Sequence, residues 1–198
     1  MTRLVLASAS PARLALLRSA GIEPIVRVSG VDESRLDHLP PAELALRLAE
    51  LKCAAVAERE DLPEDALVLG CDSVLDRGGE ALGKPADSED AVRRWRAMRG
   101  GSGVLRTGHC LRDRATGRVA AATASTTVHF ADLSDEEIDA YVATGEPLGV
   151  AGAFTVDGLG GAFVTGIEGD HHNVVGLSLP LVRDLAAELG HSWTDLWS

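Results

Sequence analysis

Near its start the chain reads Leu4-Val5-Leu6-Ala7-Ser8-Ala9-Ser10-Pro11-Ala12-Arg13, and this run indicates the fold class. Its apolar run from Leu4 to Ala9 is shorter than the roughly 7–15 residues that the hydrophobic region of a signal peptide needs. We therefore expect a short buried strand over Leu4–Ser8. Ser10 then suits the N-cap of a helix, Pro11 suits its first position, and Gly21 suits its end. A strand followed at once by a helix is typical of α/β proteins.

The remaining hydrophobic pattern predicts the order of strands and helices. Leu44, Leu48, Leu51 and Ala55 recur at helical spacing, which indicates a long helix over 41–58. Further helices are expected over 87–98, 135–145 (behind a capping box at Ser134) and 179–189, and further strands over 24–29, 66–75, 104–113, 119–130, 151–156 and 162–167, with a hairpin turn at 77–80. Helices alternate with strands at first and adjacent strands dominate the middle, so we predict an α/β fold with a mixed sheet. No linker divides the sequence, so residues 1–198 are expected to form a single domain.

Composition and charge exclude several classes of protein. The chain has 198 residues, of which 45% are hydrophobic and 25% are charged, as expected of a folded globular protein. Its 19 Lys and Arg against 30 Asp and Glu give a net charge of −11, which argues against a nucleic acid polymer as partner. No apolar run approaches the ~18 residues that a membrane span requires. Cys53, Cys71 and Cys110 form no C-x-x-C pair, which favours reduced thiols and a cytoplasmic location.

Two motifs resemble known sites but lack required features. Gly78-x-x-x-x-Gly83-Lys84 matches most of a phosphate-binding loop, yet Pro85 stands where that loop needs a Ser or Thr hydroxyl. Asp170-His171-His172 suggests a metal site, but adjacent histidines in a strand would point to opposite faces. A solvent-exposed turn is the better interpretation of these three residues.

Three places in the sequence carry residues suited to binding an anion. Asp72 lies at the end of an apolar strand, where carboxylates often face a ligand crevice, although a turn or a cap explains it equally well. The turn between Ser8 and Arg13 combines hydroxyls, a cation and a helix N-terminus, which suits phosphate, and a simple capped helix is the alternative. Taken alone, Lys52 and Lys84 fit solvated surface lysines.

Taken together, these segments resemble the Maf family of nucleoside triphosphate pyrophosphatases, which are also discussed as septum-formation inhibitors. The resemblance begins with the opening stretch and Val31-Asp32-Glu33, and covers nearly the whole chain in the family's order and spacing. It continues through Leu48-Ala49-Glu50-Leu51-Lys52, Gly70-Cys71-Asp72-Ser73-Val74-Leu75, Leu82-Gly83-Lys84-Pro85, Tyr141-Val142-Ala143-Thr144-Gly145-Glu146-Pro147, Ala151-Gly152-Ala153-Phe154 to Gly158, and Ile167-Glu168-Gly169-Asp170 to Leu177.

The resemblance implies an elongated, twisted mixed sheet flanked by helices, with a cleft between two lobes, similar to the inosine triphosphate pyrophosphatases. It also implies hydrolysis of the bond between the α- and β-phosphates of a nucleoside triphosphate, with Mg²⁺ or Mn²⁺ as cofactor. By family position, Asp72 is the proton acceptor, and Asp72 and Glu33 hold the metal. The remaining family positions are Lys52 and Lys84 as catalytic point charges, Ser8 and Arg13 on phosphate oxygens, and Ala12, Ser73 and Asp157 in substrate binding.

Three of these positions depart from the family branch that acts on dTTP and UTP. That branch usually has arginine in place of Ala12, threonine in place of Ser73 and glutamine in place of Asp157. An acid at the last position is typical of a second branch, whose substrate range includes 7-methyl-GTP. A carboxylate only accepts hydrogen bonds, and guanine presents a paired donor edge. If Asp157 faces the base, we expect guanine or cytosine nucleotides to be better substrates than dTTP.

A non-catalytic nucleotide-binding regulator of cell division is the alternative function. The combination of Asp72, Lys52 and Lys84 favours an enzyme, because a sensor has no need of an acid that activates water. Trp193 and Trp197 near the end of the chain pack either on the core or on a second subunit, so a homodimer stays open as an interpretation.

Overall fold

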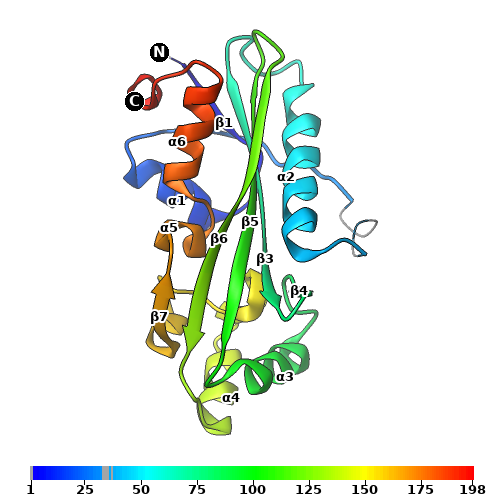
Figure 1. Ribbon diagram of the computed structural model, residues 1–198, viewed down its shortest axis with the longest axis vertical. Helices are drawn as coiled ribbons and strands as arrows, with labels where there is room; N and C mark the ends of the chain where they lie inside the picture. The colour runs from blue at the N-terminus through cyan, green and yellow to red at the C-terminus, as the bar shows by residue number, and fades with distance from the viewer. Residues whose placement is uncertain (1, 33–35, 37) are drawn as a thin grey trace.

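The computed structural model describes residues 2–32, 36 and 38–198, which form an elongated α/β molecule (Figure 1). Its strands are β1 (Leu4–Leu6), β2 (Ile25–Val26), β3 (Leu67–Arg77), β4 (Glu80–Leu82), β5 (Ser102–Asp113), β6 (Val119–Phe130) and β7 (Val164–Glu168). Its helices are α1 (Pro11–Ser19), α2 (Pro41–Ala57), α3 (Ser88–Met98), α4 (Asp135–Ala143), α5 (His171–Val175) and α6 (Leu179–Glu188). Short 3₁₀ helices span Glu146–Gly149, Ala151–Ala153, Leu159–Phe163 and Trp193–Leu196.

The described strands form one sheet of seven strands, in the order β2-β1-β3-β5-β6-β7, with β4 paired to β3. β1 runs parallel to β2 and β3, while β3, β5, β6 and β7 are antiparallel to one another in turn. The prediction of an α/β fold with a mixed sheet is therefore confirmed. β3, β5 and β6 contain 11, 12 and 12 residues, so they run most of the length of the molecule and connect its two ends (Figure 1).

Separate hydrophobic cores lie toward the two ends of the sheet. At one end, α1 and α6 cover β1, β3 and β5, with Leu6 and Leu17 fully buried between them. At the other end, Trp95 on α3 packs in a core that also includes residues of α4. The Trp95 ring makes edge-on contacts with Phe130 and Tyr141 at centroid distances of 5.7 and 5.6 Å, which is a favoured arrangement for aromatic pairs. The long central strands therefore join two differently packed halves.

Helix α2 packs unusually close to the opposite face of the sheet. A Cβ atom on Gly108 would lie 2.1 Å from the carbonyl oxygen of Ala45, and one on Gly70 would lie 2.3 Å from that of Ala49. Only a residue without a side chain allows this approach. The glycines of β3 and β5 thus fix the depth at which α2 rests on the sheet, and with it the position of every side chain on its inner face.

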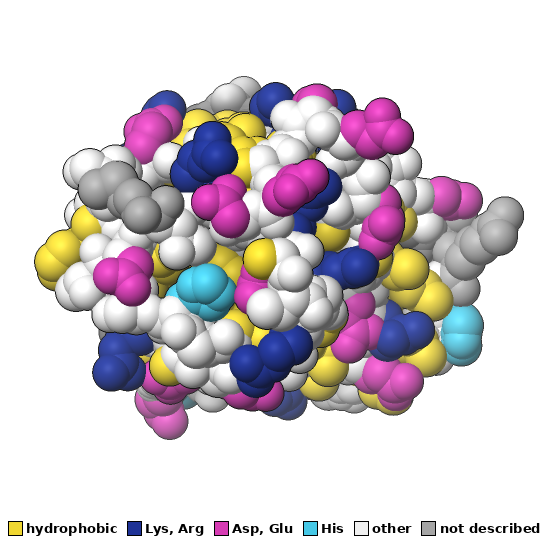
Figure 2. Space-filling model, turned by 90° about the horizontal axis from the view of Figure 1, so that it is seen from above, with side chains coloured by type: hydrophobic (Ala, Val, Ile, Leu, Met, Phe, Trp, Pro, Cys, Tyr) yellow, Lys and Arg dark blue, Asp and Glu magenta, His cyan; other side chains and the backbone are white. Residues whose placement is uncertain are grey.

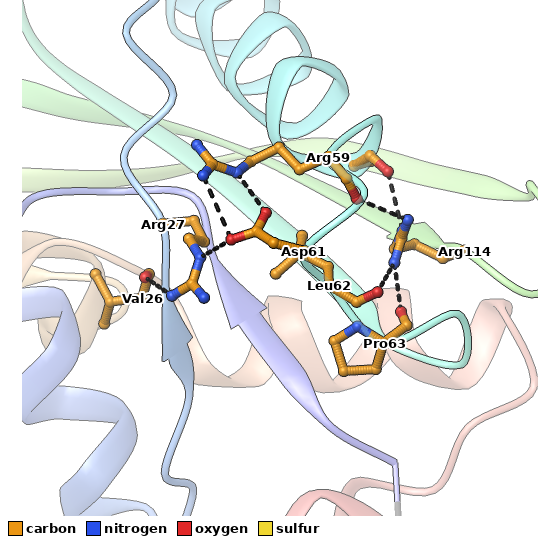
Figure 3. Close-up of polar contacts among 8 residues, drawn as sticks. Val26, Arg27, Arg59, Asp61, Leu62, Pro63 and Arg114 are labelled. Atoms are coloured by element: carbon orange, nitrogen blue, oxygen red, sulfur yellow. Dashed lines mark hydrogen bonds and ion pairs between the residues drawn. The ribbon is translucent and has the colours of Figure 1, made fainter.

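The connection between α2 and β3 is held by arginine side chains (Figure 3). Arg114 donates to the carbonyl oxygens of Leu62 at 2.7 Å and Arg59 at 2.9 Å, and also to those of Ala57 and Pro63. The carboxylate of Asp61 joins Arg59 to Arg27, at 2.9 Å from the Nε atom of each. Because a planar guanidinium offers five donors in fixed directions, one side chain satisfies four carbonyl groups in and next to this connection.

Three expected strands differ from the observed structure. Residues 151–156 are not a strand, because Gly152 and Ala153 have φ angles of 71° and 60°, which lie in the left-handed region. Residues 162–167 begin as a 3₁₀ helix and become strand β7 only from Val164. The expected strand over 24–29 is reduced to the two residues of β2. The capping box at Ser134 and the hairpin turn between β3 and β4 are confirmed.

The structure also shows where the three cysteines, the two tryptophans near the end of the chain and the surface charges lie. Cys53, Cys71 and Cys110 are free and buried. Trp193 packs against the core around α6, whereas Trp197 lies over Gly21 and is 47% exposed. Acidic and basic side chains lie among one another over the end of the molecule seen in Figure 2. No helix in the described residues is both long and apolar enough to cross a membrane.

A buried histidine ties α6 to the sheet. His109 on β5 is fully buried, its Nδ1 lies 3.0 Å from the carbonyl oxygen of Thr107, and its Nε2 accepts a hydrogen bond from the amide of Ser178 at 2.9 Å. These contacts require the ring proton on Nδ1. Burial, together with the charge of Arg13, lowers the pKa of His109 to about 4, so the ring is neutral near pH 7.

We predict that protonation of His109 destabilises the fold in mild acid. Its pKa is about 4 when folded and about 6.5 in the unfolded chain, so the unfolded chain takes up the proton first as the pH falls. The stabilisation is complete above about pH 6.5 and is lost toward pH 4, which amounts to about 2 kcal/mol between about pH 7 and about pH 4.5.

Urea denaturation at both pH values measures this loss. His109→Gln keeps an acceptor for the Ser178 amide without the titration, so its unfolding free energy should fall less than that of the wild type. An equal fall in both proteins would contradict the assignment.

Candidate active site

A gap along one edge of β3 creates a cleft in the middle of the molecule. β1 pairs with this edge over Leu67–Leu69, and β4 pairs with it over Leu75–Arg77. In the part of the chain that the structure describes, no strand pairs with the edge between these two stretches. Side chains from both faces of β3 therefore reach one cleft, whose volume is about 640 Å³. The end of a strand next to such a break is a common place for a ligand site in α/β proteins.

The walls of the cleft come from both halves of the molecule. One half contributes the turn after β1, the start of α1, residues 28–31 and the inner face of α2. The other contributes the end of β4 with Lys84, residues 149–157 and the end of α5. The long strands β3, β5 and β6 hold these walls at a fixed separation.

Arg13 on the first turn of α1 reaches across the gap and is buried. Its Nη1 donates to the hydroxyl of Ser8 at 3.1 Å and to the carbonyl oxygen of Cys71 at 3.0 Å. Its Nε donates to the carbonyl oxygen of Gly176 at 2.7 Å, and its Nη2 to the hydroxyl of Ser73 at 2.9 Å. These acceptors are uncharged, so they do not cancel the positive charge that Arg13 brings to the cleft.

Lys52 and Asp72 form an ion pair in the wall formed by α2 and β3. The Lys52 Nζ lies 2.5 Å from the Asp72 Oδ1, and both side chains are 13% exposed. Because successive strand residues point to opposite faces, Asp72 faces α2 while Ser73 faces α1 and Arg13. The close packing of α2 on Gly70 and Gly108 sets the distance across this pair. The pair presents a carboxylate held in one orientation by a neighbouring ammonium group.

Lys84 lies on a segment that α3 fixes in place. The preceding carbonyl oxygen, that of Gly83, accepts hydrogen bonds from Arg94 at 2.7 Å and from the amide of Gly152 at 3.1 Å. Arg94 is itself paired with Asp90 at 2.8 Å. The same carbonyl group therefore joins the segment that carries Lys84 to the segment that carries Asp157.

Most residues singled out from the sequence converge on this cleft, although their roles stay predictions. Residues far apart in the chain line it together: Ser8, Ala12, Arg13, Lys52, Asp72, Ser73, Lys84 and Asp157. Ser10 also lines the cleft and caps α1, accepting a hydrogen bond from the Arg13 amide at 3.4 Å. Glu33, the other predicted metal ligand, lies outside the described residues.

The Asp170-His171-His172 motif lies at the start of α5 and does not line the cleft. Asp170 caps the helix, accepting hydrogen bonds from the amide of His172 at 3.0 Å and from its ring at 3.1 Å. The expectation that the two imidazoles point apart is wrong, because this segment is helical and the rings lie 3.8 Å apart.

Several contacts that shape the cleft have no signal in the sequence. The hydroxyl of Ser73 lies 2.9 Å from that of Thr107, which is fully buried. The two residues are opposite partners on β3 and β5, so only the register of the sheet reveals the contact. The same holds for the carbonyl group of Gly176, which lies 163 residues beyond Arg13.

The oxygen donors of the cleft suit a hard divalent cation. Mg²⁺ and Mn²⁺ prefer carboxylate, hydroxyl and phosphate oxygens. Asp72 supplies a carboxylate to the cleft and Ser8 and Ser73 supply hydroxyls, whereas the thiols of Cys53, Cys71 and Cys110 are buried. The residues present therefore fit such an ion together with a phosphate ligand.

An α/β fold whose central cleft combines a buried arginine, two lysines and a carboxylate defines a class of proteins suited to binding a polyanionic ligand. Residues 3–189 match the family described as Maf-like protein, and the chain belongs to this family.

Similar proteins span nearly the whole chain. A relative from Streptomyces avermitilis is 62% identical over 196 residues, which is 99% of this chain and 95% of the relative. One from Salinispora tropica is 63% identical over 198 residues (99% and 88%), and one from Nostoc punctiforme is 54% identical over 193 residues (98% and 96%). All three are named nucleoside triphosphate pyrophosphatase.

Proposed function

We propose that this chain is a nucleoside triphosphate pyrophosphatase, which hydrolyses the α–β phosphate bond to give a nucleoside monophosphate and pyrophosphate. The observation that carries the proposal is the meeting of Arg13, Lys52, Lys84 and Asp72 in one cleft. A triphosphate carries about four negative charges near neutral pH, so its hydrolysis depends on cations that neutralise and position the phosphates. The names of relatives at 62% and 63% identity support the same reaction.

In the proposed mechanism, the positive charges of Arg13, Lys52 and Lys84 bind and orient the triphosphate. Asp72 accepts the proton of a water molecule while the water oxygen bonds to phosphorus and the α–β anhydride bond breaks. Lys52, 2.5 Å from Asp72, keeps the carboxylate pointing into the cleft. Asp72 and Glu33 would hold Mg²⁺ or Mn²⁺, which when bound supplies further charge neutralisation at the phosphates.

The cellular setting is part of the proposal. The three cysteines are free and buried, which supports a reducing compartment, the cytoplasm.

The proposal predicts that Asp72→Asn lowers kcat by about 10²–10⁴-fold, because the amide cannot accept the proton. Pyrophosphate release from a panel of nucleoside triphosphates, with Mg²⁺ or Mn²⁺, measures the effect. Asp76→Asn is the matched control: Asp76 lies on the same strand and pairs with Arg106 at 3.1 Å, and the amide keeps an acceptor for the Gly79 amide. The control should stay within about threefold of the wild type.

If the wild-type protein binds nucleotides but turns over none of them, this result would contradict the proposed enzymatic activity. That result would favour the alternative, a nucleotide-binding regulator of cell division.

Base preference is a second prediction of the proposed function. Asp157 lines the cleft and is exposed to it, and its carboxylate accepts hydrogen bonds only. Guanine offers N1–H and N2–H₂ side by side, whereas thymine offers one N–H between two carbonyl groups. We expect kcat/KM for GTP or CTP to exceed that for dTTP by about tenfold, the discrimination typical of one good hydrogen-bonded pair.

Asp157→Gln should narrow or reverse this preference, because an amide both donates and accepts. If dTTP is the best substrate and the ranking does not change in the variant, Asp157 does not read the base.

A further inference from the structure

A single carboxylate organises the segment on which Asp157 lies. Glu146 follows α4, and its Oε1 accepts hydrogen bonds from the hydroxyls of Tyr141 at 2.9 Å and Thr155 at 2.5 Å. The amide of Gly160 donates to the same oxygen at 2.9 Å, and the amide of Leu159 donates to Oε2 at 2.9 Å. Hydrogen bonds to a charged acceptor are among the stronger ones in proteins.

Asp157 lies midway between two of the residues that donate hydrogen bonds to the Glu146 carboxylate. Thr155 lies two residues before Asp157, and Leu159 lies two residues after it. Both are held by Glu146, while the Asp157 side chain is left to line the cleft. The carboxylate therefore fixes the two ends of a five-residue turn that presents one acid to the ligand.

The chain packs directly onto this carboxylate. A Cβ atom on Gly158 would lie 2.6 Å from the Glu146 Oε2, and one on Gly160 would lie 2.3 Å from the Tyr141 hydroxyl oxygen. Both distances are shorter than real Cβ contacts, so a side chain at either position would displace the groups that hold the loop. The loop is therefore packed closely around Glu146.

Both partners keep the protonation state that these contacts need. Burial alone would raise the pKa of Glu146, but the hydrogen bonds from Thr155, Leu159, Gly160 and Tyr141 outweigh it and lower this pKa to about 2. Burial raises the pKa of Tyr141 to about 12, so its hydroxyl remains a donor. The arrangement is therefore the same across the whole physiological range of pH.

The neighbouring part of the segment is held by contacts that do not include Glu146. The Nε1 of Trp95 donates to the carbonyl oxygen of Ala153 at 2.8 Å, and Phe154 packs edge-on against Phe130 at a centroid distance of 5.0 Å. The amide of Gly152 is bonded to Gly83, beside Lys84. A change at Glu146 therefore releases the half of the segment that carries Asp157 and leaves the half that borders Lys84 in place.

We propose that Glu146 is a positioning residue for base recognition: it holds Asp157 at the cleft and acts on substrate choice through it. This inference rests on the proposed function. It separates two parts of the cleft, a phosphate part built on Arg13, Lys52, Asp72 and Lys84, and a base part that depends on Glu146.

The test compares Glu146→Gln, Thr155→Val, Asp157→Ala and the double variant Glu146→Gln/Asp157→Ala, with Glu136→Gln as control. Glu136 is an exposed acid on the first turn of α4, so its variant loses the same charge in the same lobe. Steady-state kinetics with GTP, CTP and dTTP give kcat and KM for each nucleotide, and thermal denaturation checks folding. Thr155→Val removes one donor to Glu146 at nearly constant volume, so it tests the inference even where Glu146→Gln folds poorly.

We expect Glu146→Gln to raise KM for the preferred nucleotide by about tenfold and to change kcat less than about threefold. The ratio of kcat/KM between preferred and poor nucleotides should collapse toward that of Asp157→Ala. Adding Glu146→Gln to Asp157→Ala should leave that ratio unchanged, because both changes act on the same contact. Thr155→Val should shift the ratio in the same direction by a smaller factor.

An unchanged nucleotide ratio in Glu146→Gln, or an equal loss of kcat on all nucleotides, would overturn the inference. A ratio that Glu146→Gln still alters in the Asp157→Ala background would also overturn it. Failure of the proposed function is a different result, since the wild type would then release no pyrophosphate from any nucleotide.

Discussion

Arg13 is a buried cation whose hydrogen bonds reach three separate parts of the chain, and the cleft depends on it. The edge of β3 is left without a partner strand where β1 ends and before β4 begins, which exposes carbonyl groups that must be satisfied. The guanidinium donates hydrogen bonds to the Cys71 carbonyl group on that edge, to the carbonyl group of Gly176 after α5, and to the hydroxyl of Ser8 in the turn between β1 and α1. An amino acid with fewer fixed donors could not both form hydrogen bonds across this gap and supply a positive charge next to it.

The cleft needs side chains from both faces of the sheet, and the gap in β3 supplies them. Asp72 points toward α2 and meets Lys52, while Ser73 points toward Arg13 and Thr107. Glycines under α2 bring that helix close enough for its lysine to reach the strand. A second set of contacts, from α3 and Glu146, shapes the opposite wall. The phosphate-binding and base-binding parts of the cleft are therefore held by different elements, which allows base preference to change while the phosphate part is kept.

Local signals in the sequence were enough to predict the main elements. The helical spacing of α2, the capping box of α4 and the strand-to-helix turn before α1 each depend on a few neighbouring residues, and the structure has all three. The strand expected over 151–156 was wrong because the left-handed backbone at Gly152 and Ala153 depends on contacts with distant segments. Hydrophobic spacing carries no information on such contacts.

The same difference between local signals and distant contacts applies to the candidate site. Its residue types were recognised through the resemblance to the Maf family, and eight of them line the cleft. Thr107 and Glu146 were not singled out, because their contacts follow from sheet register and from a turn that closes around one carboxylate.

³¹P NMR of the reaction products shows which phosphate bond is cleaved in this cleft, and we expect cleavage between the α- and β-phosphates of the nucleoside triphosphate. The triphosphate signals should be replaced by those of a nucleoside monophosphate and of pyrophosphate, in equal amounts. Signals of a nucleoside diphosphate and inorganic phosphate would contradict this expectation, because they would show cleavage at the terminal phosphate.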